Sequence, residues 1–258
     1  MRYFSVLIFS AIIIVEMLQG MGIGATAGVV KIYAEPGKKS YSKTLRLINP
    51  DNWGKHFVVS ITKSAPKKEY LPVSKLSWIK VEPETVFIAG KGKSEPIKIV
   101  VQIPDSDVYY NRRFVCRVEV SQASLNALSA GLVIPVYIDT KENRKIPDTC
   151  GDCGIVVYPH RLEIDGNIDS LTIVNWTSDT VNLTLGWNQP KQDNWKKAMK
   201  IFENVMGTFI PIGDTLQLMP KTKRTIFLKP ISFPGKGKLY FSDAKNNVDY
   251  TELIWGNW

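Results

Sequence analysis

Apolar and polar residues alternate in short runs through the first half of the chain. Between residues 97 and 103, Ile97, Ile99 and Val101 are separated by Lys98 and Val100. A period of two places successive side chains on opposite faces of an extended backbone, so such a run predicts a strand with one buried face. Alternating runs bounded by turn-forming residues predict strands at residues 29–34, 42–48, 56–62, 97–103, 114–120 and 132–138.

The spacing of these runs indicates the fold class. Turn formers such as Asn49-Pro50-Asp51 separate the runs, and no helical period of any length interrupts them. Roughly seven short strands within about 110 residues are typical of an immunoglobulin-like β-sandwich. We therefore predict an all-β fold whose first sandwich domain covers residues 28–140.

Residues 141–154 are polar and contain Pro147 and a Cys-x-x-Cys, so we expect a linker there. Strand-like runs resume at residue 155, which predicts a second immunoglobulin-like sandwich in tandem, over residues 155–258. Trp255 and Trp258 are expected to cover an open end of this second domain.

One segment of the second half, residues 191–206, departs from the strand pattern. Its large apolar side chains recur at spacings of four, three and four, which places them on one face of a helix. We expect a short helical insertion packed on the second sandwich; a helix lying on a membrane surface is the alternative. The residues of this face are Trp195, Met199, Phe202 and Met206.

The N-terminus has the features of a secretory signal peptide. Arg2 precedes an apolar run at residues 4–15, and Ala25-Thr26-Ala27 has the small-x-small form of a signal peptidase site. We expect a signal peptide over residues 1–27, a mature chain that begins at Gly28, and a periplasmic or extracellular location. The alternative is an uncleaved N-terminal anchor.

The net charge of +9 changes the expected partners. Nucleic acid is excluded as a partner of an exported chain, whereas acidic protein clients, anionic surface polymers and lipid head groups suit a basic protein. Peripheral contact with a membrane is compatible with this charge. The lysines are scattered along the chain, which favours a solvated surface over one dedicated basic site.

The chain has three cysteines, at positions 116, 150 and 153. Export into an oxidising environment favours a local disulfide between Cys150 and Cys153. Three alternatives stay open at this point: a zinc site, a redox-active pair, and a cysteine that carries a lipid or a partner protein. Cys116 lies within an alternating run and is expected to be a small buried apolar residue.

No pattern of residues in this chain indicates catalysis. His56 and His160 are the only histidines, they lie far apart in sequence, and neither has a metal-ligand spacing. Common nucleophile, zinc-protease and phosphate-loop motifs are missing from the sequence. We expect a protein that is not an enzyme and has no cofactor and no metal site.

The order of cues in the first half resembles a known family. A strand that ends in a Pro-Gly turn, an apolar strand that runs into Asn-Pro-Asp, and the segments YYNRRFVCRVEV and VIPVYI occur in sequence over residues 28–140. This resembles the immunoglobulin-like (PapD-like) periplasmic pilus assembly chaperones and related surface-protein modules. Pro135 indicates that the strand at 132–138 lies at a sheet edge, because proline has no backbone N–H to donate to a neighbouring strand.

The resemblance implies that the strand at residues 132–138 is lent to an incomplete subunit. It also implies a basic pair that anchors the carboxylate of the client. Here the chain departs from the family, since only Lys31 and Lys141 lie near the expected positions. The side chains implied to contact the client are Leu132, Ile134, Val136 and Ile138.

Three functions follow from these observations. The leading hypothesis is a non-catalytic chaperone or adaptor that binds extracytoplasmic protein subunits by strand addition during assembly of a pilus-like surface structure. The alternatives are a structural component of a surface layer or appendage, and a protein that binds a surface polymer.

Overall fold

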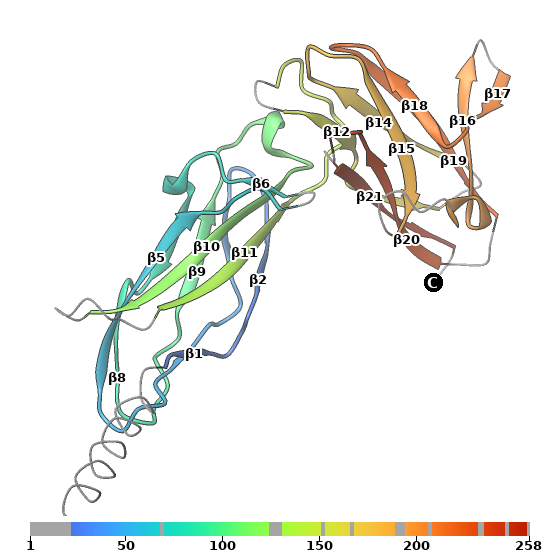
Figure 1. The fold of residues 1–258 in the computed structure, drawn as a ribbon. Coiled ribbons are helices and arrows are strands. Elements are labelled where there is room, and N and C mark those ends of the chain that lie inside the picture. The colour runs from blue at the N-terminus through green and yellow to red at the C-terminus, as the bar shows by residue number, and fades with distance from the viewer. Residues whose placement is uncertain are drawn as a thin grey trace, which may run out of the picture.

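Strands dominate the protein, which is an all-β immunoglobulin-like sandwich fold (Figure 1). The computed structural model describes residues 22–67, 70–123, 131–150, 153–165, 168–188, 194–205, 208–231, 235–245 and 248–256. Within these ranges the helical elements are three short 3-10 turns, η1 (Leu76–Trp78), η2 (Asp107–Tyr109) and η3 (Asn194–Lys197). No helix in the described part of the chain is long and apolar enough to cross a membrane.

The N-terminal half forms one large sheet that faces smaller ones. The large sheet has the order β2 (Val30–Ala34), β11 (Gly131–Thr140), β10 (Arg113–Gln122), β5 (Lys55–Lys63) and β8 (Thr85–Ile88), and β6 (Leu71–Pro72) pairs with β10. A second sheet contains β3 (Lys39–Tyr41), β9 (Lys98–Gln102) and β7 (Ile79–Glu82). A third, two-stranded sheet joins β1 (Gly24–Ala25) to β4 (Leu47–Ile48).

Alternating side chains from these strands form one apolar core. Phe57, Ile99, Val118 and Ile138 are at most 1% exposed, and each comes from a different strand. Burial of this kind contributes about 25 cal/mol per Å² of apolar surface and drives the sheets together. Most of the predicted strands are confirmed; the run at 42–48 is the exception, because only Leu47–Ile48 forms a regular strand there.

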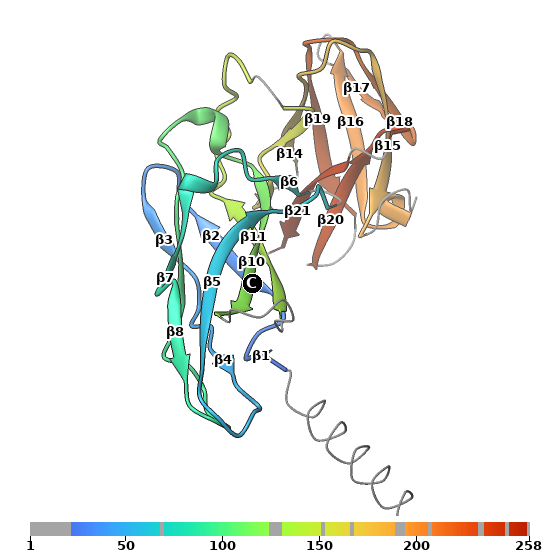
Figure 2. The same cartoon turned by 60° about the vertical axis from the view of Figure 1, so that its left-hand side comes forward.

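The C-terminal half contains two five-stranded sheets with their own core (Figure 2). One has the order β12 (Ile155–Tyr158), β14 (Asp169–Asn175), β19 (Lys223–Pro230), β16 (Met199–Val205) and β17 (Thr208–Pro211). The other has the order β13 (Arg161–Ile164), β21 (Val248–Trp255), β20 (Gly235–Ser242), β15 (Val181–Trp187) and β18 (Thr215–Leu218). The boundaries 28–140 and 155–258 stay a prediction.

The predicted helical insertion at residues 191–206 is wrong. Met199–Val205 is strand β16, and the only helical part described in this segment is the 3-10 turn η3. Met199 and Ile201, two residues apart, are 1% and 2% exposed, and β16 pairs with β19 from Met199↔Pro230 to Phe202↔Phe227. Hydrogen bonding to β19 and burial of alternate side chains in the core make this segment a strand, although its apolar residues are spaced as in a helix. Met206 lies outside the described residues.

The last strand carries one of the two tryptophans expected to close the second half. Trp255 is 5% exposed and lies against Trp187, with 5.9 Å between the ring centroids. Trp258 lies outside the described residues. Trp187 and Trp255 thus pack between β15 and the end of β21, where they extend the core to the end of the sheet.

The segment expected to end the signal peptide packs against the N-terminal core. The apolar run at residues 4–15 lies outside the described residues. Gly24–Ala25, however, form β1 and pair with Leu47–Ile48, and Ile23, Ala25 and Ala27 pack against the N-terminal core. Cleavage after Ala27 would remove this strand.

Candidate functional site

Strand β11 has a hydrogen-bonding edge that is covered over only part of its length. On one side it pairs with β10 from Gly131 to Asp139. On the other side β2 runs parallel to it, and the pairing begins only at Val136↔Val30 and ends at Thr140↔Ala34. In the part of the chain that the structure describes, no strand pairs with this second side of residues 131–135.

The path of the first strand explains the uncovered edge. Residues 24 and 25 pair with β4 in a separate two-stranded sheet, and the chain reaches β11 only at Val30. The N-terminal strand therefore changes sheets between Ala25 and Val30. Because one strand cannot pair in two sheets at the same point, the first half of β11 is left without a neighbour. Pro135 lies at the end of this uncovered half and pairs with Arg117 of β10.

The structure places most of the predicted client-contacting side chains inside the protein. Ile134, Val136 and Ile138 are at most 1% exposed and belong to the N-terminal core, and Leu132 is half-buried against the same core. The expectation that all four fill the groove of a client is corrected accordingly. Val133, on the opposite face of β11, is 53% exposed and is the apolar side chain that this edge presents to solvent.

The two lysines proposed as a carboxylate anchor have separate surroundings. Lys31 is exposed on β2, in register with Tyr137. The Lys141 ammonium lies 3.0 Å from a carboxylate oxygen of Glu35, and this hydrogen bond raises the pKa of Lys141. Lys141 is therefore engaged with an acidic group of the same chain.

A buried charged cluster joins β10 to the C-terminal sheets. Arg113 Nη1 lies 2.6 Å from Asp249 Oδ1, and Arg113 Nη2 donates to the Tyr250 carbonyl at 2.9 Å. The Arg113 guanidinium also lies 3.3 Å from the centroid of the Tyr250 ring. The backbone N–H of Val157 donates to Asp249 Oδ2 at 2.8 Å. The carboxylate of Asp249 thus holds β10, β12 and β21 together.

Burial sets the protonation states in this cluster. Burial alone would raise the pKa of Asp249, but the contacts with His160, Arg113 and the Val157 N–H lower it below its usual range. His160 Nε2 lies 3.6 Å from Asp249 Oδ2. Burial lowers the pKa of His160 to about 4, and Arg113 acts in the same direction. At neutral pH the ion pair is therefore between Arg113 and Asp249, with His160 uncharged.

Sequence reasoning missed the roles of Arg113 and Asp249. Arg113 is the residue just before an alternating run, and Asp249 lies between Val248 and Tyr250 at the start of the last strand-like run. An acidic residue within a strand of a buried sheet is the signal that could have pointed to it, because an unpaired charge is rarely buried. Its partner could not have been identified, since it lies 136 positions away.

A cleft lies beside this cluster. It has a volume of about 720 Å³ and is lined by Tyr33, Glu142, Arg144, Arg161, Glu163 and Asp165. The Tyr33 hydroxyl donates a hydrogen bond to Glu142, and burial together with this contact raises the pKa of Tyr33. Acidic and basic groups thus share the cleft, which can hold a partner by polar contacts.

A disulfide links Cys150 to Cys153, as the sequence had favoured. Both cysteines are buried in a small apolar cluster with Val156, Tyr158 and Val174. Cys116 is fully buried in β10, and burial raises the pKa of its thiol to about 12. In the described part of the chain no three His, Cys, Asp or Glu residues are grouped so that they could hold a metal ion.

No protein-family model matches this chain, and no curated protein matches it. Similar solved structures include a protein of unknown function from Porphyromonas gingivalis W83, with 9% identity, a TM-score of 0.38, and coverage of 91% of this chain and 99% of that one. The Salmonella enterica SafA pilin in complex with the SafB chaperone has 16% identity, a TM-score of 0.35, and coverage of 91% and 96%. The E. coli chaperone DraB has 17% identity, a TM-score of 0.33, and coverage of 90% and 97%. The solved structures that this chain resembles thus include PapD-like pilus chaperones, and at these identities the likeness concerns the fold.

Proposed function

We propose that this protein is a non-catalytic periplasmic or extracellular chaperone or adaptor, which binds protein subunits of a surface structure by strand addition. The client strand would pair with the uncovered edge of β11 at residues 131–135. The observation that carries the proposal is the pairing of β11, which has β10 on one side throughout but β2 on the other side only from Val136 onward.

Backbone hydrogen bonds would supply most of the affinity at this edge. A strand without a neighbour presents unpaired N–H and C=O groups, which an extended segment of another protein can satisfy. Pro135 has no N–H to donate, so it limits how far toward Val136 a client strand can extend its ladder. Strand β2 occupies this same edge of β11 from Val136 onward, so it sets the same limit on the client strand.

Side chains near the edge would add apolar contacts. Val133 is 53% exposed on the solvent-facing side of β11, and Leu132 is half-buried on the core side, so each can contact a client while the strand keeps its position. Ile134 and Val136 have a different role: their burial fixes the position of the strand, so that the edge is already in place before a client binds. Of the two proposed carboxylate anchors, Lys31 is the better candidate, because Lys141 is already bound to Glu35.

The test is capture of a subunit by strand-edge variants. The chain is co-expressed with an affinity-tagged pilin-like subunit, and the amount of co-purified complex is measured. Val133→Lys and Val133→Pro are expected to reduce capture at least tenfold, the first by charge and the second by loss of a backbone donor that faces the uncovered edge, as the nitrogen of Pro135 does. Val58→Lys is the matched control, because Val58 is 39% exposed but lies on β5, which is paired with β10 and β8.

The outcomes separate the proposal from its alternative. Equal capture by Val133→Lys, Val133→Pro and Val58→Lys would exclude this edge as the binding site. Self-association of the wild-type chain that Val133→Lys abolishes would instead indicate a structural component that polymerises through the same edge. Charged substitutions at Ile134 and Val136 are unsuitable, because these buried positions would unfold the protein.

A further inference from the structure

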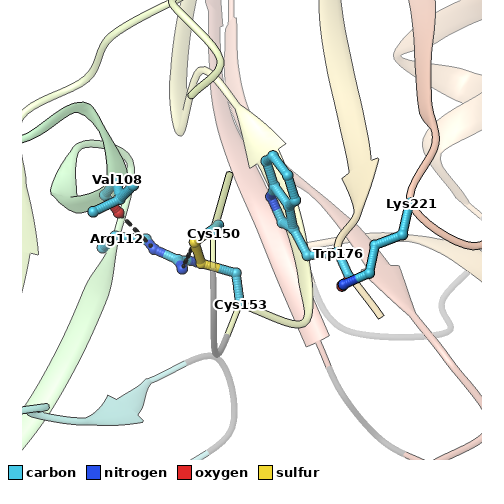
Figure 3. Close-up of a disulfide and its surroundings, with 6 residues drawn as sticks. All are labelled: Val108, Arg112, Cys150, Cys153, Trp176 and Lys221. Carbon is cyan, nitrogen blue, oxygen red and sulfur yellow. Dashed lines mark hydrogen bonds between the residues drawn. A yellow bond between two sulfur atoms is a disulfide. The ribbon is translucent and has the colours of Figure 1, made fainter. Parts of the chain in front are cut away.

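The disulfide lines a cavity beside a buried arginine (Figure 3). The cavity has a volume of about 580 Å³, and its walls come from β6, η2, the start of β10 and the segment that carries the cysteines. Cys150 and Cys153 are 8% and 6% exposed and both contribute to its lining. The other residues that shape it include Leu71, Val73, Val108 and Arg112.

Arg112 contacts one sulfur of the pair. Its Nη2 donates to Cys150 Sγ at 3.0 Å, and its Nε donates to the Val108 carbonyl at 3.2 Å. The Arg112 residue is 8% exposed, so its charge acts in surroundings of low dielectric constant. Among the described residues no carboxylate forms an ion pair with it. In the described part of the chain, the Arg112 guanidinium therefore donates hydrogen bonds to two acceptors, a carbonyl oxygen and a sulfur.

This arrangement favours a reduced, negatively charged Cys150. A guanidinium keeps its proton even when burial lowers its pKa, as it does for Arg112. A cation next to a cysteine stabilises the thiolate and makes that sulfur the better leaving group. The other titratable groups nearby are Lys63 and Tyr109, which line the cavity, and Tyr158 and Asp249, which act on Arg112.

We propose that Cys150 and Cys153 form a thiol–disulfide exchange site, which oxidises dithiol segments of extracytoplasmic proteins, with Arg112 stabilising the Cys150 thiolate. The site is separate from the edge of β11 and does not depend on strand addition. The apolar walls supplied by Leu71 and Val73 suit an extended peptide that carries the two thiols.

Oxidation of one segment balances between its two thiols and the disulfide. A thiolate of the dithiol attacks Cys153 Sγ, the bond between the two sulfurs breaks, and its electron pair goes to Cys150 Sγ, which faces Arg112. The second thiol of the segment, after losing its proton to solvent, attacks the segment's own sulfur in the mixed disulfide. The electron pair of that bond goes to Cys153 Sγ, which takes up a proton. The segment loses two electrons and the cysteine pair gains them; a small disulfide such as oxidised glutathione restores the pair.

The decisive comparison is between Arg112→Gln and the wild-type chain. Both carry Cys116→Ala, so that Cys150 and Cys153 are the only cysteines that the measurement detects. Each protein is equilibrated in mixtures of reduced and oxidised glutathione, and the reduced fraction is measured by alkylation and mass spectrometry. Loss of the guanidinium is expected to make the disulfide harder to reduce. The value of [GSH]²/[GSSG] at which half of the protein is reduced should rise about tenfold. A change of about one unit in the pKa of the Cys150 thiol has an effect of this size.

A second readout follows the reduced cysteines and the exchange reaction. Cys150 is expected to be alkylated at least tenfold faster than Cys153 at pH 6.5 in the wild-type chain, and this preference should disappear in Arg112→Gln. Oxidation of a reduced synthetic peptide with two cysteines should slow about tenfold in the same variant. Arg112→Lys, which keeps a positive charge, should recover part of both effects.

The control is Arg117→Gln, which removes a half-exposed arginine from the same region of the chain without touching the disulfide. It should behave as wild type. Equal half-reduction points for Arg112→Gln and wild type would overturn the role of Arg112. Failure of the folded wild-type protein to exchange with glutathione would overturn the site as a whole. Thermal unfolding of each oxidised variant confirms that the comparison is between folded proteins.

Discussion

Arg113 and Asp249 lie 136 positions apart in the chain, and their side chains meet with 2.6 Å between Nη1 and Oδ1. Both are buried, and Asp249 also accepts hydrogen bonds from the backbone N–H groups of Val157 and Tyr250. The pair therefore ties β10 of the N-terminal sheets to β12 and β21 of the C-terminal ones. Its consequences for stability can be measured directly.

Removal of Asp249 should destabilise the protein strongly. Asp249→Ala leaves the buried Arg113 charge with only the longer contact to Asp139, 3.9 Å from its Nε, and loss of one partner of a buried ion pair typically costs about 3–5 kcal/mol. Urea unfolding followed by tryptophan fluorescence measures the change. Arg144→Ala is the control: its partner is Asp169, its side chain is 63% exposed, and exposed pairs contribute about 0–1 kcal/mol. Similar losses in the two variants would contradict a special role for the buried pair.

Stability should fall as the pH drops from about 6.5 to about 4. The pKa of His160 is lowered from 6.5 to about 4 in the folded protein, so the unfolded chain binds a proton in this range before the folded one does. The stability that neutral His160 contributes is complete above pH 6.5, and roughly 3 kcal/mol of it is lost by pH 4. The free energy of unfolding measured across this range should show the decline.

His160→Gln should flatten that part of the pH profile, because the substituted side chain does not titrate. Asp249 contributes in a different window: its pKa is lowered below 3.8, so its stabilisation is lost only at more acidic pH. His56→Gln, which changes an exposed histidine, is the control and should leave the profile of the wild-type protein in place. A profile that keeps its slope in His160→Gln would show that another group causes it.

The mature protein is expected to keep residues 22–27. Ile23, Ala25 and Ala27 pack against the N-terminal core, and Gly24–Ala25 pair with Leu47–Ile48, so a chain that begins at Gly28 would lose a strand. Intact-mass measurement and N-terminal sequencing of the exported protein should place its first residue at or before Gly22. A mature chain that starts at Gly28 would show that β1 is dispensable and would support the processing site predicted from the sequence.

Close packing of a glycine against a tryptophan should make Gly237→Ala destabilising. A Cβ atom at position 237 would clash with the Trp187 ring, far inside van der Waals contact. Overpacking of this kind typically costs about 1–3 kcal/mol. Gly213→Ala is the matched control, since nothing lies within 4 Å of the added atom. Thermal unfolding of the two variants compares them, and equal midpoints would show that the Trp187 ring moves aside at no cost.

Local sequence was sufficient for most of the strands and for the fold class. Period-two alternation reports which side chains can face a core, and the buried faces of β2 and β5 follow it. The same reasoning failed at Met199, where apolar spacing matched a helix and the structure has a strand. Pairing with β19 decided that segment, because a pattern of apolar residues does not by itself specify which neighbour the backbone will hydrogen-bond.

The candidate site was only partly within reach of the sequence. Pro135 pointed to a sheet edge, and the cysteine spacing pointed to the disulfide that the structure contains. The face of β11 that carries Ile134 and Val136 is buried, and the sequence could not show this, since their alternation is expected of an exposed apolar face as well as of a buried one. Alternation identifies two faces but not which of them the rest of the protein covers.

What the sequence determined by itself was the set of local preferences: strands, turns, and a pair of cysteines close enough to be joined. Tertiary structure alone decided three things: that β2 reaches β11 only at Val136, that Arg113 meets Asp249, and that Arg112 contacts Cys150. The physical reason is the same in each case. These contacts join residues that lie between 38 and 136 positions apart, and their formation depends on how whole sheets pack rather than on any neighbouring residue in the chain.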